Sequence, residues 1–245
     1  EFWGFGDWEQ LPPVEPDIYT DDYKNHPQIK EMFGRKEYHL TINRRSGEDA
    51  EAIENAVRDI KSDKLDIEPF KPNKSIDEYT THLAYYKEKC KEINRMLMLK
   101  NKPESAIMVK TPNMDFNEEM WLYNGLPLIS MKNVKDDGIA KNEDFILDRI
   151  ENTTIYIKRE DYGDGEEIEY KFEVEDFIRS FCARYCITIH RSQGDTIKGE
   201  FLIHNWKKIE ELKEYGYMND LTIRAVRYVA FTRTTSIDNV KILPF

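Results

Sequence analysis

The residues with the most chemical capacity lie close together at 187–197, where the chain reads ITIHRSQGDTI. The first three alternate Ile, Thr and Ile, which is the β-branched, period-two pattern of a strand. Positions 190–193 then carry four side chains that can form hydrogen bonds, and Gly194 permits a tight turn or a close approach to a ligand. Open α/β sheets place their ligands at strand ends of this kind. By itself, the pattern also fits a polar turn after a buried strand.

Two other stretches combine polar and turn-forming residues, GDWEQLPPV at 6–14 and YVAFTRTTS at 228–236. Together with TIHRSQG at 188–194 they resemble, in chain order, motifs III, V and VI of superfamily 1 helicases. The resemblance is closest to the RecD-like branch, which moves 5′ to 3′ on single-stranded DNA. That family typically shows G-D-x-x-Q-L-P-P-V, T-[IV]-H-[KR]-S-Q-G and Y-[VT]-A-[LIF]-[ST]-R. Three independent strings in the right order make the resemblance specific.

The resemblance assigns two arginines to ATP hydrolysis between two RecA-like lobes. Arg233 matches the arginine of motif VI, an arginine finger that stabilises charge on the γ-phosphate and contributes about 10³–10⁵ in rate in comparable sites. Arg45 lies in LTINRRS, which resembles the L-x-x-N-x-R-S of motif IV, and it would meet the γ-phosphate. Arg44 precedes it, so either of the two can hold that place. Without the resemblance, Arg233 would be read as complementing a helix dipole and Arg45 as a surface ion pair.

Motif III supplies three further candidates. The resemblance implies that Gln10 senses the γ-phosphate and links it to the loop on the DNA side, while Asp7 supports this loop or the hydrolysis site. Trp8 departs from the small or apolar residue that is commoner in the family. It belongs either to the core or to the strand channel, where its ring would stack on a base.

Motif V has two roles in the family. By position, the resemblance makes Thr188, His190 and Ser192 candidates for contacts with DNA, and Gln193 and Gly194 candidates for contacts with the nucleotide. His190 has no partner in the sequence that would make it a general base or a metal ligand. We therefore expect no metal site in this chain.

Two weaker correspondences add residues near the DNA path. AYYKEKCKEIN at 84–94 resembles the family's strand-helix segment that ends in I-N, with Asn94 matching. LYNGLPLISMKNV and KNEDF resemble the family's SH3-like domain, which guides the strand. There the resemblance implies Lys132 and Asn133 as DNA contacts, together with Asn142.

The sequence contains no G-x-x-x-x-G-K-[ST] and no Asp-Glu pair on a strand before Gly6, so it lacks the groups that hold the phosphates and Mg²⁺. We expect ATP and Mg²⁺ to be held mainly by an N-terminal RecA-like lobe outside this sequence. FWGFGD at 2–7 reads as a strand already under way. The chain is thus interpreted as the second motor lobe with the tail of the first, and this fragment alone is expected to be inactive.

Composition limits the class of protein. The chain has 245 residues and a net charge of −11, which argues against a broad basic face for nucleic acid and favours a local groove. Much of the acid lies at 160–176, which we interpret as a solvated hairpin. No window approaches the 18 apolar residues of a membrane span. The three cysteines lack zinc-ligand spacing, so a reducing, intracellular setting is the default.

The elements that must position these residues follow a β-α-β-α alternation, which predicts a RecA-like parallel sheet flanked by helices. Short β-like runs broken by NG, DDG and GDG turns predict a small SH3-like β insertion. A capping box of Ser46 and Asp49 is expected to begin one helix. The predicted domains are the tail of the first lobe and connector (1–35), the second lobe (36–105 and 175–245) and the insertion (106–174). The predicted helices span about 28–33, 48–62, 87–100, 175–183, 207–216 and 221–232, and the predicted lobe strands 38–42, 81–86, 186–190, 200–206 and 239–243.

These observations predict an ATP-dependent 5′→3′ DNA helicase of replication or repair. Its expected partners are single-stranded DNA, duplex junctions, the N-terminal lobe, and primase or other replication proteins. FTRTTS followed by IDNVKIL also resembles helicase-primase subunits of large DNA viruses, which implies a nuclear or cytoplasmic site of viral replication. The alternatives are a catalytically silent helicase-like scaffold module and an RNA helicase of the same superfamily, because a 2′-hydroxyl contact cannot be placed.

Overall fold

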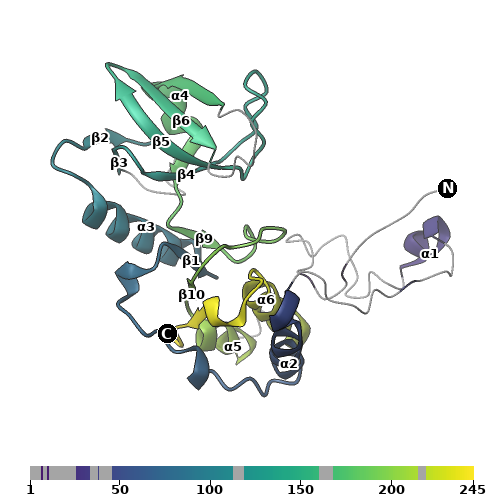
Figure 1. Ribbon diagram of the computed structural model, residues 1–245. Helices are drawn as coiled ribbons and strands as arrows, with labels where there is room; N and C mark the ends of the chain where they lie inside the picture. Colours follow the sequence, from purple (N-terminus) through teal and green to yellow (C-terminus); the bar gives the residue numbers. More distant parts are fainter. Residues whose placement is uncertain are drawn as a thin grey trace. The chain divides into compact units, whose positions relative to one another are not determined.

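The computed structural model describes residues 7, 10, 26–33, 38, 46–112, 119–159, 168–214 and 219–245 (Figure 1). The chain divides into two compact units. The first unit comprises Glu1–Asn73 and Ser192–Phe245, and the second unit comprises Lys74–Arg191.

The first unit pairs two parallel strands with helices. The amphipathic helix α2 buries Ile53, Ala56 and Ile60, at helical spacing, and packs against α6 (Figure 1). The rings of Phe70 and Phe231 pack in a T-shaped, edge-on arrangement, with centroids 5.2 Å apart. The elements of this unit are the helices α1 (Pro27–Phe33), α2 (Ala50–Lys61), α5 (Trp206–Glu214) and α6 (Asp220–Phe231), and the parallel strands β10 (Phe201–Ile203) and β11 (Val240–Ile242).

The second unit contains another parallel pair, β1 (Thr81–Ala84) and β9 (Cys186–Thr188), in which Ala84 lies opposite Thr188. Helix α3 (Lys87–Asn101) packs against both strands (Figure 1). Parallel strands with flanking helices confirm the predicted α/β class.

Antiparallel strands occupy most of the segment where the sequence predicts a β insertion. Their aromatic core stacks Phe177 on Phe181 and sets Phe145 and Phe172 at an angle to Phe181. Helix α4 (Val174–Ser180) connects the last two strands. The strands are the hairpin of β2 (Ile107–Lys110) and β3 (Glu119–Leu122), and a sheet in the order β7-β6-β5-β4-β8 formed by β4 (Pro127–Ser130), β5 (Asp144–Glu151), β6 (Thr154–Arg159), β7 (Glu169–Glu173) and β8 (Phe181–Ala183).

The predicted capping box at α2 is wrong. Neither Ser46 nor Asp49 makes a side-chain cap hydrogen bond, because a 3-10 turn over Gly47–Asp49 precedes the helix. The Asp49 carboxylate instead accepts from the amide of Ile237 at 3.3 Å. A complete capping box does occur at the 3-10 turn Ile76–Glu78, between the side chains of its N-cap serine and its last residue.

Several boundaries also differ from the prediction. The strands expected at 81–86 and 186–190 end at Ala84 and Thr188. The helix expected at 175–183 ends at Ser180, because Phe181 adopts extended backbone and starts β8. The strand expected at 200–206 ends at Ile203, and α5 already begins at Trp206. The strand expected at 38–42 and the predicted helix end at Gly216 lie outside the described residues.

Candidate functional site

Arg233 follows α6 and is buried, with 3% of its surface exposed. Its Nε donates to the carbonyl of Val229 at 2.8 Å, and its Nη1 donates to the carbonyls of Ser192 at 3.1 Å and Asp195 at 3.3 Å. In return, the amide of Ile197 donates to the carbonyl of Arg233 at 2.6 Å. The guanidinium therefore joins the end of α6 to the loop that follows β9.

The same loop meets the motif III stretch. Gln193 Nε2 donates to Gln10 Oε1 at 2.8 Å. Gly194 follows with φ at +99° and open space around a would-be Cβ, so this position requires glycine for its backbone angle and not for lack of room. The amides of both glutamines lie on one loop junction in the first unit.

Asp7 makes a second contact of the same kind. Its Oδ2 accepts from the hydroxyl of Tyr228, on α6, at 2.7 Å. The Nζ atom of Lys61, at the end of α2, lies 5.9 Å from the centroid of the Tyr228 ring. The two described residues of the 6–14 stretch are thus bonded to the 188–194 and 228–236 stretches. Trp8 and Arg45, with Arg44, lie outside the described residues.

In the second unit, Thr188 and His190 lie at the carboxyl end of β9. The Thr188 hydroxyl accepts from the amide of Arg191 at 3.2 Å. The His190 ring packs against the ring of Tyr85, with centroids 5.6 Å apart. Burial lowers the pKa of His190, so its imidazole is mainly neutral at neutral pH and can form hydrogen bonds without carrying a positive charge.

Ser192 is fully buried. Its carbonyl accepts from Arg233, so its backbone takes part in the contact between the loop after β9 and the end of α6. The predicted contact between its side chain and DNA would need a change that exposes this side chain.

Asn94 holds β9 to α3. Its Nδ2 donates to the carbonyl of Cys186 at 2.9 Å, and its Oδ1 accepts from the amide of Cys186 at 2.8 Å. The amide side chain therefore satisfies both backbone groups of one strand residue, as a neighbouring strand would. With 6% of its surface exposed, Asn94 positions the strand that leads to Thr188 and His190.

The sequence did not predict a structural role for Arg191. Its Nε donates to Asn142 Oδ1 at 2.8 Å, and its Nη2 donates to the carbonyl of Ser130 at 2.8 Å. Asn142 adopts φ of +74°, a left-handed angle that asparagine tolerates better than most residues. Arg191 thus anchors the motif V stretch to the segment between β4 and β5. The available signal was its lysine-or-arginine position in the motif.

Lys132 and Asn133 lie on that same segment and are exposed. The side chain of Asn133 accepts from the amide of Lys141 at 2.7 Å, so it shapes the loop. Lys132 places a positive charge on the surface of the second unit.

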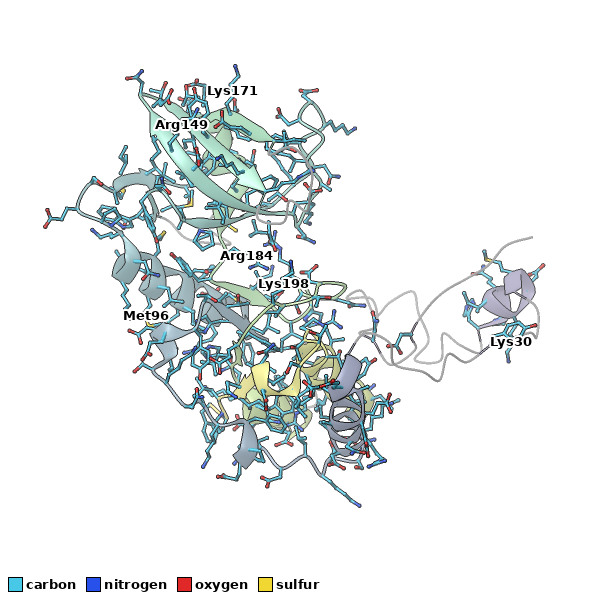
Figure 2. The ribbon with its side chains drawn as sticks, in the orientation of Figure 1. Lys30, Met96, Arg149, Lys171, Arg184 and Lys198 are labelled. Atoms are coloured by element: carbon cyan, nitrogen blue, oxygen red, sulfur yellow. The ribbon has the colours of Figure 1, made fainter. Side chains whose placement is uncertain are left out.

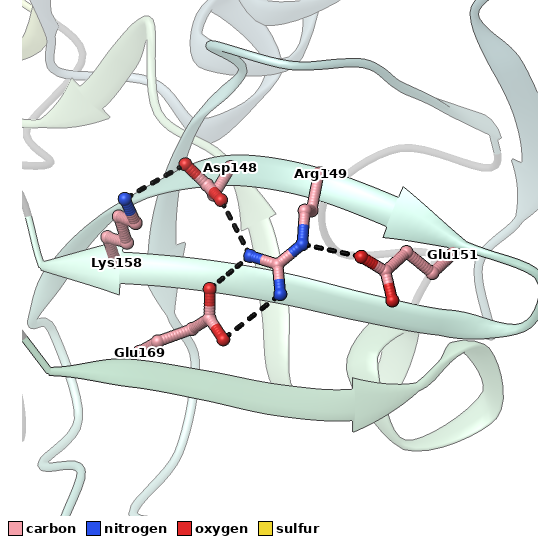
Figure 3. Close-up of polar contacts among 5 residues, drawn as sticks. All are labelled: Asp148, Arg149, Glu151, Lys158 and Glu169. Atoms are coloured by element: carbon pink, nitrogen blue, oxygen red, sulfur yellow. Dashed lines mark hydrogen bonds and ion pairs between the residues drawn. The ribbon is translucent and has the colours of Figure 1, made fainter.

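An unpredicted charge network covers one face of the antiparallel sheet (Figure 3). Arg149 Nε donates to Glu151 at 2.7 Å, Nη1 to Asp148 at 2.9 Å, and Nη2 to Glu169 at 3.2 Å. These carboxylates raise the pKa of Arg149 above its ordinary value, Glu169 contributing most. Because three carboxylates surround it, this guanidinium is a poor phosphate ligand.

From Arg149, a row of paired residues runs across strands β5, β6 and β7. Arg149 pairs with Tyr156 on β6, and Tyr156 pairs with Lys171 on β7. Figure 2 labels the two ends of this row, Arg149 and Lys171. The guanidinium carbon of Arg149 lies 3.8 Å from the centroid of the Tyr156 ring. This face is therefore tied together across three strands.

Neither a metal cluster nor a membrane span is found in the part of the chain that the structure describes. No group of three His, Cys, Asp or Glu residues there could hold a metal ion, and none of the helices there is long and apolar enough to cross a membrane. Cys90, Cys182 and Cys186 are free and buried.

No protein-family model matches the sequence, and no curated protein matches it. Solved structures of Pif1 helicases do match. The Pif1 helicase from Candida albicans matches with a TM-score of 0.66 and 15% identity over 98% of this chain and 63% of that one. Bacteroides Pif1 bound to ssDNA matches with a TM-score of 0.60 and 18% identity over 97% of this chain and 61% of that one. The structure of two coordinating Pif1 helicases at forked dsDNA matches with a TM-score of 0.61 and 20% identity over 97% of this chain and 59% of that one.

This chain therefore spans only about three fifths of the length of these helicases. Identities of 15–20% carry the fold and not the details of activity. The predicted likeness to helicases is confirmed at this level: the chain has the fold of the matching part of the solved Pif1 helicases.

Proposed function

We propose that this chain is the C-terminal motor half of an ATP-dependent DNA helicase that moves 5′ to 3′ on single-stranded DNA, in the RecD-like manner. The observation that carries the proposal is the loop after β9. Arg233 donates to two of its carbonyls and Gln10 accepts from its Gln193 side chain. Three stretches that are far apart in the sequence, each resembling a helicase motif, thus share one junction.

The donors at this junction suit the γ-phosphate end of a nucleotide. Arg233 supplies a guanidinium, and Gln10 and Gln193 supply amide groups, all in the first unit. In this proposal, the cation and the inner phosphates are held mainly by an N-terminal lobe. ATP with Mg²⁺ supplies the hydrolysable phosphoanhydride.

In this proposal, Arg233 exchanges its partners during the cycle. Its guanidinium now donates to the neutral carbonyls of Ser192 and Asp195. A γ-phosphate is a stronger acceptor, because hydrogen bonds between charged groups are shorter and stronger than neutral ones. Loss of Arg233 from the two carbonyls would free the loop, and the chain leads from this loop directly back to His190 and Thr188. Nucleotide state would thereby change the DNA-side residues.

The DNA contacts that we propose are local. Thr188 and His190 offer hydrogen bonds, and Lys132 offers a charge on the segment that Arg191 anchors. Asn133 supports that segment from within. A net charge of −11 argues against a broad basic face, so contacts with DNA phosphates have to come from a limited set of residues.

The test is hydrolysis of ATP by the full-length protein, with and without single-stranded DNA. We expect DNA-stimulated hydrolysis that Arg233→Ala lowers by about 10³-fold while strand binding is kept. Because Arg233 is buried, Arg233→Lys and a thermal melt accompany it to separate chemistry from folding. The matched control is Arg149→Ala, whose guanidinium is already held by three carboxylates.

Several outcomes would overturn parts of the proposal. Equal hydrolysis by the folded Arg233 variants and the parent protein would remove the arginine-finger assignment. Unwinding of duplexes that carry only a 3′ tail would contradict the proposed direction. Stronger stimulation by RNA than by DNA would favour the RNA helicase alternative. Nucleic-acid binding without any hydrolysis would favour the scaffold module.

A further inference from the structure

We propose that Tyr85 is a stacking platform for one unpaired base of the single strand, held in place by His190. This inference rests on the proposed function and adds a residue that none of the three motifs contains. All of its geometry lies within the second unit.

Tyr85 and His190 leave neighbouring strands at the same edge. Ala84 lies opposite Thr188 in the parallel pair, and the amide of Ile189 donates to the carbonyl of Ala84 at 2.9 Å. Each aromatic ring therefore follows directly after the last bonded position of its strand. The carboxyl edge of parallel strands is where α/β proteins bind their ligands.

The Tyr85 ring contacts two other rings, and neither of these is parallel to it. The His190 ring is tilted by 53° with its centroid 5.6 Å away, and the Tyr86 ring is nearly perpendicular at 5.0 Å. Tyr85 is only partly buried, whereas Tyr79 and Tyr185 of the same unit are buried. A large ring that is partly exposed and meets both of these neighbouring rings at an angle is positioned to receive a flat ligand.

Charge favours a base over a phosphate at this place. Burial raises the pKa of Tyr85 and lowers the pKa of His190, so both rings are neutral at neutral pH. Neutral aromatic rings bind bases by stacking, which every base permits. The charge that we propose for a phosphate contact, Lys132, lies on another segment of the unit. We therefore assign Tyr85 a contact that is independent of salt and of sequence.

The experiment compares two strands of equal length bound by the full-length protein: oligodeoxythymidine and an abasic deoxyribose-phosphate oligomer. We expect Tyr85→Ala to weaken binding of oligodeoxythymidine by about tenfold and to leave binding of the abasic oligomer unchanged. Tyr85→Phe keeps the ring and should bind as the parent does. Tyr156→Ala, a half-exposed tyrosine under Arg149 on β6, is the matched control and should stay within about twofold.

Salt dependence separates stacking from phosphate contact. The slope of log affinity against log salt should be the same for Tyr85→Ala and the parent, whereas Lys132→Ala should lower it by about one. A reduced slope for Tyr85→Ala, equal losses on both oligomers, or parent-like binding by Tyr85→Ala would each overturn the assignment. So would a Tyr85→Phe variant as weak as Tyr85→Ala.

A second readout does not depend on how well Tyr85→Ala folds. Oligodeoxythymidine carrying 5-iodouracil is photo-crosslinked to the parent protein, and the joined peptide is identified by mass spectrometry. A crosslink at Tyr85 supports the proposal, and crosslinks elsewhere only would overturn it. If the parent protein binds no single-stranded DNA, the proposed function fails as well. If it binds single-stranded DNA but Tyr85→Ala binds equally well, only this inference fails.

Discussion

Gln10 and Gln193 are 183 positions apart, and their side-chain amides meet at 2.8 Å, with Nε2 of Gln193 donating to Oε1 of Gln10. The contact joins the stretch that resembles motif III to the loop of motif V within the first unit. Arg233 bonds that loop through the adjacent carbonyl of Ser192. Polar groups at this junction therefore depend on one another, which makes their coupling measurable.

The first prediction concerns that pair of glutamines. Gln10→Ala and Gln193→Ala should each lower DNA-stimulated ATP hydrolysis by about 2–10-fold, since a neutral hydrogen bond contributes about 0.5–1.5 kcal/mol. The double variant should be little worse than either single one, because both remove the same contact. Steady-state kcat values for the four proteins give the result. Fully additive losses would mean that the two amides act separately.

The second prediction concerns the stability of the first unit. Arg233→Ala removes the guanidinium donor from the carbonyls of Val229, Ser192 and Asp195, although the Ser192 carbonyl keeps the amide of Asp195 as a donor. An unmet buried polar group costs about 1–3 kcal/mol. We expect the free energy of unfolding to fall by roughly that amount, and ATP to protect the variant less than the parent. Urea titration with and without nucleotide measures both effects. An unchanged unfolding midpoint would show that these bonds stabilise nothing.

The third prediction tests the amide that holds β9 to α3. Asn94→Leu leaves the amide and carbonyl of Cys186 unmet, so it should cost roughly 3–5 kcal/mol. Asn94→Asp keeps the acceptor but removes the donor and buries a charge, and should be at least as costly. The exposed Asn133→Ala, which loses one hydrogen bond to a loop amide, should cost only about 1 kcal/mol. The ranking is measured by urea unfolding, and an Asn94 variant as stable as Asn133→Ala would contradict it.

The fourth prediction is a dependence of stability on pH. His82 is fully buried, with its Nε2 3.0 Å from the carbonyl of Tyr79. Burial lowers its pKa from 6.5 to about 4, against a smaller raising effect of that carbonyl. The unfolded chain therefore binds a proton between these two values that the folded chain does not bind. The contribution of neutral His82 to the free energy of unfolding should be fully present above pH 6.5. It should decline as the pH falls toward 4, by up to roughly 3 kcal/mol.

Unfolding midpoints at pH 7 and pH 5 test this prediction. His82→Gln keeps a donor for the Tyr79 carbonyl and cannot titrate, so it should remove most of the decline. The lowered pKa of His190 acts in the same direction and accounts for part of what is left. A His82→Gln protein that loses as much stability as the parent between the two pH values would refute the assignment.

Local pattern predicted much of the fold. The apolar spacing of α2 and α3 and the β-branched pair Ile187 and Thr188 of β9 are visible in the sequence, because helix and strand periodicity come from the backbone itself. Ser46 and Asp49 show where this reasoning stops. Their residue types suit a capping box, but a 3-10 turn precedes the helix, and the Asp49 carboxylate accepts from the distant amide of Ile237 instead. A contact with a residue 188 positions away leaves no local signal.

The sequence by itself determined which residue types are present at the candidate site: a guanidinium, two glutamines and a glycine in motifs that resemble those of helicases. Only the tertiary structure decided their partners. It paired Gln10 with Gln193, turned Arg233 toward the carbonyls of Ser192 and Asp195, and set Tyr85 beside His190. The reason is physical: residue type sets what a group can bond to, whereas burial and the crossing of distant segments determine which bonds it makes.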